Sequence, residues 1–362
     1  MGKWCVRRAA QFVVTAFLAT IGLIAVTPPA SACACGGVVN PPGETTAVTQ
    51  ETALITRHGG QETIVMSLSA RSDATKAGLL VPTPKPATPA LADRSVFTDL
   101  SEQTTPRQRT RHHLFGPPVL FGGTDDSSAN GAAPQSAAPT GVHVLSAVDL
   151  GPLRAVSLTA GNAGDLHTWL DKHGFVMSRR FEALVTPYLD KGWAFTAMTL
   201  TPKGKSLSGD LPPVSLRFAS DKLVYPMRMS RGAKETQRVT TYVLADHRVA
   251  RTDPTARQGD LRTTYADRVD TSKLTSPTLQ QLAVGEPWLT EMSQVFDDPG
   301  AQVRSDFTFT SAAHDTPVVS YYYTDDYLIP GDIAVLLVIL LGAVAGGVAT
   351  FVIRRRATPV TA

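Results

Sequence analysis

Two cysteines offer the clearest reactive chemistry in this sequence of 362 residues. Cys33 and Cys35 lie one residue apart in the run Cys33-Ala34-Cys35-Gly36-Gly37. Thiols outside the cytoplasm are normally oxidised, so the pair is expected to form a disulfide. A ring this small needs a sharp backbone turn and is more easily reduced than a long-range bridge. The spacing therefore favours either a bond that only fixes the local backbone or a thiol-redox role. Metal binding would need two further ligands, which the sequence does not indicate.

Motifs of the common enzyme classes are missing from the sequence. It has no His-Glu-x-x-His for zinc, no Gly-x-Ser-x-Gly nucleophile and no phosphate-binding glycine loop. Ser220-Asp221-Lys222 resembles one motif of penicillin-interacting enzymes, but their Ser-x-x-Lys motif is absent. The eight histidines are scattered without the spacing of metal ligands. Catalytic residues are therefore unknown, and no metal or cofactor is predicted.

The charged residues differ between the ends and the middle of the chain. The sequence carries 34 Lys and Arg against 31 Asp and Glu, a formal net charge of +3. Six of the basic residues lie at the two ends, so the middle has 28 basic residues against 31 acidic ones. This balance gives no support for nucleic-acid binding. One local basic run, Arg107-Gln108-Arg109-Thr110-Arg111-His112-His113, is interpreted as a solvated loop or helix end.

An apolar segment near the C-terminus predicts a membrane anchor. Ile333 to Ile353 contains no charged residue and is followed directly by Arg354, Arg355 and Arg356. About 20 apolar residues cross a bilayer, and a basic cluster after them favours the cytoplasmic side. We therefore predict one transmembrane helix over residues 332–353, a cytoplasmic basic tail over 354–362, and the lipid bilayer as a partner.

Two glycines within this span have the spacing of a helix-pairing motif. Gly342 and Gly346 form Gly-x-x-x-Gly, which lets two helix backbones approach closely in lipid. This spacing allows a homodimer through the span, and the alternative is that the glycines have no pairing role, since glycine is common in membrane helices for other reasons. The segment has no ionisable residue, so it offers no transport route or proton relay.

The N-terminus resembles a cleavable signal peptide over residues 1–32. Lys3, Arg7 and Arg8 precede an apolar run, and Ala30-Ser31-Ala32 has the small residues of a cleavage site. Two alternatives remain, an uncleaved anchor and lipidation of Cys33. With cleavage, residues 33–328 form an extracytoplasmic domain at the cell membrane, and 43% apolar with 18% charged residues suits a globular core.

Periodicity predicts an α+β domain rich in antiparallel strands, with a few short helices. Strands are expected at residues 52–57 and 62–69, joined by the turn His58-Gly59-Gly60-Gln61. Residues 122–141 are small and polar and are predicted to be a disordered insertion. The prolines after Val81, beginning with Pro82, are expected to exclude that stretch from a sheet.

Helices are predicted where caps and helical spacing coincide. Asp93 is expected to cap a helix that runs through Gln103, and Asn162 or Asp165 to cap one that ends near His173. Residues 247–275 are interpreted as loop. A helix is expected to start at Ser276-Pro277, and the apolar residues up to Phe296 are expected to dock onto the sheet.

Several blocks of the sequence resemble one bacterial family. Ala34-Cys35-Gly36-Gly37 is similar to the opening of that family after its signal peptide, and Leu80-Val81-Pro82-Thr83-Pro84 to its next element. Trp169-Leu170 with His173-Gly174, and Leu223-Val224-Tyr225-Pro226-Met227, resemble later blocks. The family is that of domain of unknown function 2330, whose members are secreted or membrane-anchored. The resemblance brings no catalytic residues. It leaves any shared cysteine role open, because members often carry the second cysteine downstream of Cys-Gly-Gly.

Together these features predict a single-pass envelope protein whose outer domain binds or scaffolds an envelope protein or polymer. The alternatives are an extracytoplasmic hydrolase acting on envelope material and a thiol-redox role of Cys33 and Cys35. The sequence favours a protein that is not an enzyme, because no catalytic motif is present.

Overall fold

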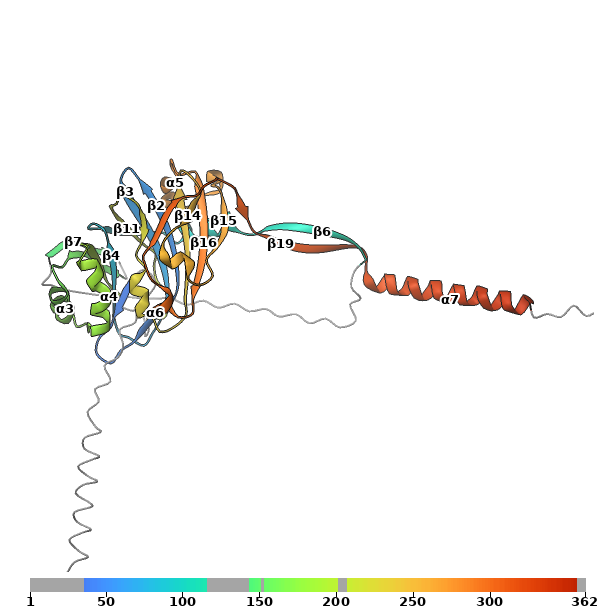
Figure 1. The fold of residues 1–362 in the computed structure, drawn as a ribbon, viewed down its shortest axis with the longest axis horizontal. Helices are drawn as coiled ribbons and strands as arrows, with labels where there is room; N and C mark the ends of the chain where they lie inside the picture. The colour runs from blue at the N-terminus through green and yellow to red at the C-terminus, as the bar shows by residue number, and fades with distance from the viewer. Residues whose placement is uncertain (1–35, 116–142, 151–152, 201–206, 357–362) are drawn as a thin grey trace, which may run out of the picture.

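The computed structural model describes residues 36–115, 143–150, 153–200 and 207–356 (Figure 1). The predicted signal peptide, Cys33 and Cys35, and the predicted insertion 122–141 lie outside the described residues. Within them the chain forms an α+β body, from which a two-stranded ribbon and one long helix project (Figure 1). The fold class predicted from the sequence is therefore confirmed.

A nine-stranded sheet forms the centre of the body. Its order is β18-β15-β16-β13-β2-β3-β11-β5, with β10 paired to β3. All neighbouring strands are antiparallel except β13 and β2, which run parallel. The strands are β2 (Thr46–His58), β3 (Gln61–Ser72), β5 (Thr88–Leu91), β10 (Gly209–Asp210), β11 (Val214–Ala219), β13 (Gln237–Ala245), β15 (Arg262–Arg268), β16 (Trp288–Phe296) and β18 (Val318–Val319).

Two smaller sheets and the helices complete the body. The five-stranded sheet has the order β1-β4-β9-β8-β7, and the three-stranded sheet β12-β17-β14. Their strands are β1 (Gly37–Val39), β4 (Ala77–Thr83), β7 (His143–Leu150), β8 (Leu153–Thr159), β9 (Ala194–Leu200), β12 (Leu223–Tyr225), β14 (Val249–Arg251) and β17 (Phe307–Ser311). The helices are α2 (Ser95–Thr104), α3 (Ala163–Lys172), α4 (Arg179–Leu189), α5 (Pro277–Leu282) and α6 (Pro299–Gln302), with 3-10 turns η2 (Arg228–Gly232), η3 (Pro254–Arg257) and η4 (Thr271–Lys273).

The central strands of the body are buried on both faces, and their alternating side chains build three cores. On β2, Ala53 and Ile55 face a core shared with the smaller sheets, whereas Leu54 faces a core with α2 and α5. On β4, Leu79 faces the shared core, and Leu80 faces a third core with α3 and α4. Because successive strand residues point to opposite faces, a continuous apolar strand contributes side chains to the cores on both sides of its sheet. The body is therefore layered as helix, sheet, sheet, helix.

Several elements predicted from local signals are confirmed. The hairpin of β2 and β3 turns at Gly59 and Gly60, which have φ of 56° and 75°. This conformation strains residues that carry a Cβ, and it is the one that a two-residue hairpin turn requires. Helix α3 is capped by the Asn162 side chain, which accepts a hydrogen bond from the Asp165 N–H, and Gly174 takes the left-handed position after it.

Predictions made from single residues at element ends were wrong in two places. Pro82 lies inside β4, because β1 pairs with that strand only up to Leu80 and leaves one side of Pro82 without a neighbour. The N-cap of α2 is Arg94 and not Asp93. The Asp93 carboxylate instead accepts hydrogen bonds from the Ser276 and Thr278 hydroxyls, both at 2.9 Å.

The region after residue 246 differs most from its sequence-based prediction. Residues 247–275 contain β14 and β15, and the predicted helical docking segment ends at α5 and continues as strand β16. In β16 the buried face includes Thr290 and Gln294, so polar residues obscure the alternation. Both side chains have hydrogen-bond partners inside the fold. The Thr290 hydroxyl accepts from the Val249 N–H at 3.2 Å, and the Gln294 carbonyl accepts from Arg251 at 2.6 Å.

A ribbon of two parallel strands connects the body to a long apolar helix (Figure 1). The strands are β6 (Arg107–Phe115) and β19 (Tyr321–Ile329), and the helix is α7 (Gly331–Arg356). The basic run is thus a strand, and not a loop or helix end. Its arginines are accommodated by tyrosines, since the Arg109 and Arg111 guanidinium carbons each lie 3.7 Å from the ring centroids of Tyr321 and Tyr323, respectively. Among the described residues, α7 is the one helix long and apolar enough to cross a membrane.

Candidate anion-binding groove

An open groove of about 500 Å³ lies beside the three-stranded sheet. Four stretches of chain line it: the turn after α4, β12 with η2, the segment from β14 to η3, and the approach to β17. The lining residues are Lys191, Trp193, Lys222, Val224, Arg228, Thr252, Asp253, Pro254, Arg304, Ser305, Asp306 and Thr308. They include four cations. A second hollow on the surface has no excess of positive charge, because its lining contains Asp73 and Glu235 as well as Arg71 and Lys234.

The turn after α4 carries Lys191 and Trp193 to the groove. The Gly192 N–H donates to the Leu189 carbonyl at 2.8 Å, and the Trp193 N–H donates to the Tyr188 carbonyl at 3.0 Å. Gly192 has φ of 65°, the left-handed conformation that commonly ends a helix. The Trp193 ring packs 5.1 Å from the Tyr188 ring, and the Lys191 ammonium lies 5.5 Å from the Trp193 ring centroid. The helix end thus fixes both side chains.

Asp306 connects this turn to η2 below the groove. Its buried carboxylate accepts hydrogen bonds from the Tyr188 hydroxyl and from the N–H groups of Met227 at 3.0 Å and Arg228 at 3.2 Å. Burial, and next the charge of Asp306, raise the pKa of Tyr188 well above its usual range, so this hydroxyl remains a donor. The Lys191 ammonium lies 4.0 Å from Asp306. Asp306 therefore positions Arg228 at the groove.

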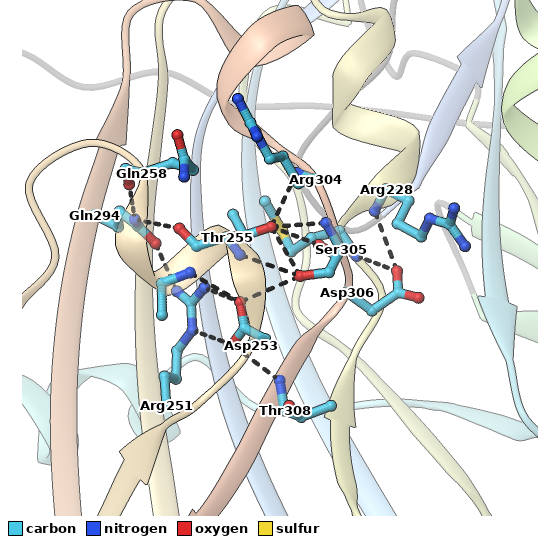
Figure 2. Close-up of polar contacts among 12 residues, drawn as sticks. Arg228, Arg251, Asp253, Thr255, Gln258, Gln294, Arg304, Ser305, Asp306 and Thr308 are labelled. Carbon is cyan, nitrogen blue, oxygen red and sulfur yellow. Dashed lines mark hydrogen bonds and ion pairs between the residues drawn. The ribbon is translucent and has the colours of Figure 1, made fainter.

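A buried ion pair supports the other side of the floor, as Figure 2 shows. Arg251 Nε and Nη2 donate to the two oxygens of Asp253 at 2.9 and 2.7 Å, and these side chains are only 1% and 2% exposed. Burial lowers the pKa of Arg251, and Asp253 raises it. The Asp253 carboxylate also accepts from the N–H groups of Ala256 at 3.0 Å and Thr308 at 3.2 Å. The pair thereby holds η3 against β17.

Three cations of the groove have no acidic partner. Within the described part of the chain, no carboxylate oxygen lies within 4.0 Å of Lys222, Arg228 or Arg304. Lys222 and Arg304 are exposed and Arg228 is half-buried. In Figure 2 the guanidinium groups of Arg228 and Arg304 extend away from Asp253. The lining holds four cations against two carboxylates, and Asp253 is already paired with Arg251, so the groove presents net positive charge to solvent.

This arrangement suits binding better than acid–base catalysis. Both Asp253 and Asp306 are engaged by several donors, which leaves little room for a proton transfer to a substrate. Across the described ranges, no group of three or more His, Cys, Asp or Glu is placed to hold a metal ion. The unpaired cations can bind phosphate or carboxylate groups, and the half-exposed Trp193 offers a flat face to a ring.

Glu62 stabilises the wall of the groove from behind. It lies on β3, is fully buried, and its Oε1 accepts a hydrogen bond from the N–H of Val224 on β12 at 2.8 Å. Burial raises the pKa of Glu62 to about 8, so the group is mostly protonated at neutral pH. A neutral carboxylic acid therefore links the nine-stranded sheet to the three-stranded sheet next to Lys222.

Those site residues predicted from the sequence that the structure describes do not line the groove. Cys33 and Cys35 fall outside the described residues, so a disulfide or thiol-redox role stays a prediction. Gly342 and Gly346 lie on α7, where a side chain at either position would meet open space beyond the helix's own backbone, and pairing through them also stays a prediction. Arg354, Arg355 and Arg356 end this helix.

Sequence reasoning missed the groove because its cations come from separate segments. Lys222 belongs to Ser220-Asp221-Lys222, the run that resembles one motif of penicillin-interacting enzymes without its companion motif. In the structure Ser220 closes a turn, since its hydroxyl donates to the Lys222 carbonyl at 2.6 Å. Lys191, Arg228 and Arg304 carried no spacing signal, because the fold alone brings them together.

The fold and the groove define a mixed α+β protein with a basic surface groove and one helix that could insert in a bilayer. The chain belongs to a bacterial family of unknown function, described as "uncharacterized protein conserved in bacteria (DUF2330)", whose model matches residues 29–310. This membership confirms the resemblance seen in the sequence. No curated protein and no solved structure matches the chain.

Proposed function

We propose that this protein is a membrane-anchored binding module of the cell envelope whose groove binds an anionic, sugar-containing polymer. The observation that carries the proposal is the set of three unpaired cations, Lys222, Arg228 and Arg304, next to the half-exposed ring of Trp193. Phosphate or carboxylate groups would pair with the cations, and the apolar face of a sugar would stack on the ring.

The proposed location follows from the two apolar ends of the chain. Helix α7 is long and apolar enough to anchor the body, and the arginines at its end favour a cytoplasmic C-terminus. The N-terminal segment 1–32 acts as a signal peptide, so the body faces outward, where envelope polymers are found. The near-neutral body does not attract polyanions in general, so the local charge of the groove provides the selectivity.

Co-sedimentation of the full-length, detergent-solubilised protein with isolated bacterial cell wall tests this function. We compare the wild type with the double variant Lys222→Gln, Arg304→Gln and with a control, Lys85→Gln, Lys234→Gln, which removes two exposed positive charges outside the groove. The groove variant should bind at least about tenfold more weakly, since each lost charged contact costs about 1 kcal/mol or more. The control should bind like the wild type.

The chemical class of the ligand is tested in the same assay. Removing phosphate groups from the wall should reduce wild-type binding if phosphate is the anion, and blocking carboxylates should do so if carboxylate is. Binding that depends on neither treatment, or that both double variants weaken equally, would contradict an anion-binding groove.

A further inference from the structure

The ribbon brings a second segment of the chain to the level where the helix α7 begins. Only Pro330 separates the end of β19 at Ile329 from the start of α7 at Gly331. The Ala334 N–H donates to the Pro330 carbonyl at 3.1 Å, so the helix follows the strand without a linker. Because β6 runs parallel to β19 and pairs Phe115 with Ile329, β6 also reaches this level.

This end of the ribbon exposes apolar side chains. Leu114 is 56% exposed and Leu328 is 77% exposed. The register pairs His113 with Tyr327 and Phe115 with Ile329, so Leu114 and Leu328 are neighbours on one face. Tyr327 lies on the opposite face, with its ring 5.4 Å from that of His113. Large exposed aliphatic side chains at the tip of a projecting ribbon are unfavourable in water.

Farther from α7, the chemistry of the ribbon changes in the order found across a membrane surface. Tyr327 follows the leucines on the opposite face. The next pair on the face of Tyr327 is Arg111, stacked on Tyr323, with Asp325, whose carboxylate lies 2.9 Å from His113 Nε2. Tyrosine favours the headgroup region, and arginine pairs with lipid phosphates while its stem stays in apolar surroundings. The bilayer surface is the partner that matches all three in this order.

We propose that the end of β6, at Leu114, is a second membrane contact that enters the interfacial layer of the bilayer beside α7. The inference rests on the proposed anchoring by α7. Two contacts from segments more than 200 residues apart in the sequence would hold the ribbon upright and keep the body at a fixed distance from the bilayer. Nine strand residues at about 3.3 Å each make this distance about 30 Å.

Depth-dependent fluorescence quenching in vesicles tests the contact. The full-length protein is reconstituted in vesicles of phosphatidylcholine and phosphatidylglycerol, with lipids brominated either near the headgroup or deep in the chains. Tryptophan is introduced as Leu114→Trp, as Leu336→Trp within α7, and as Val284→Trp, which is 69% exposed on the body. The signal of the wild-type tryptophans is subtracted in each case.

We expect shallow bromine to quench Leu114→Trp several-fold more than Val284→Trp, and deep bromine to quench Leu336→Trp most strongly. If Leu336→Trp is quenched while Leu114→Trp behaves like Val284→Trp, the second contact is wrong and the anchor stands. If Leu336→Trp is not quenched, the proposed anchoring fails, and the contact fails with it.

Discussion

At the scale of single residues, Glu62 makes the stability of this protein depend on pH. Its pKa rises from 4.5 to about 8 on folding because burial disfavours the carboxylate. Because its pKa is raised, Glu62 in the folded state binds more protons than in the unfolded state. Its stabilising contribution to the free energy of unfolding is therefore fully present below pH 4.5. It declines as the pH rises and is lost above about pH 8. This shift in the pKa of Glu62 corresponds to about 5 kcal/mol in the free energy of unfolding.

Glu62→Gln should remove this dependence, because the amide stays neutral and keeps an acceptor for the Val224 N–H. We expect the variant to be more stable than the wild type at pH 9 by up to about 5 kcal/mol, and similar to it at pH 4.5. Urea unfolding in detergent at both pH values measures the difference. Glu102→Gln, the same exchange at an exposed position, is the control; a Glu62 variant that follows the wild type at both pH values would contradict the raised pKa.

A variant of Trp193 distinguishes binding of the sugar part of the proposed ligand from binding of its anionic part. Trp193→Ala should weaken binding of phosphate-bearing wall polymers about tenfold, since a stacked ring contributes about 1 kcal/mol or more. Inorganic polyphosphate has no ring to stack, so its binding should change less than twofold. Titration of both polymers against the full-length variant provides the comparison, and an equal loss for both would show that Trp193 acts only through the shape of the groove.

At the scale of elements, one carboxylate joins the two helices that cover the large sheet. Asp99 on α2 is buried and accepts hydrogen bonds from the N–H groups of Thr275 and Ser276 at 2.7 and 2.8 Å, just before α5. Asp99→Ala should lower the free energy of unfolding by about 2 kcal/mol, because the buried N–H of Ser276 and the part-buried N–H of Thr275 lose their acceptor. Glu102→Ala on the exposed side of α2 should change it by less than about 0.5 kcal/mol. Chemical unfolding measures both variants. An equally small loss in the free energy of unfolding for the two would refute the role of Asp99 in joining the helices.

Individual helices and strands also differ in how far they could be predicted from the sequence. The β2–β3 hairpin and α3 were predictable, because glycines in the turn and an asparagine cap act within a few residues. Strand β16 was not, since Thr290 and Gln294 interrupt its apolar alternation. Their partners lie in β14 and around η3, within a stretch that was predicted to be loop. The groove was hidden for a related reason, as its cations gather from segments up to about 110 residues apart.

At the scale of the whole molecule, the proposed topology has the body outside the membrane and the C-terminus in the cytoplasm. Protease added to intact cells without their wall should digest the body and leave a fragment that contains α7. Immunoblotting against a C-terminal tag measures the fragment, which should lose the tag only after lysis. A body protected in intact cells would reverse the topology.

In-cell photo-crosslinking tests the central claim, polymer capture in the groove, most directly. A photoreactive residue is placed at Thr252, an exposed residue of the groove, and at Val284 as a control on another part of the body. If the groove captures the polymer, crosslinked species that carry envelope carbohydrate should form from position 252 and not from position 284. Equal carbohydrate crosslinking from both positions, or none from position 252, would contradict it.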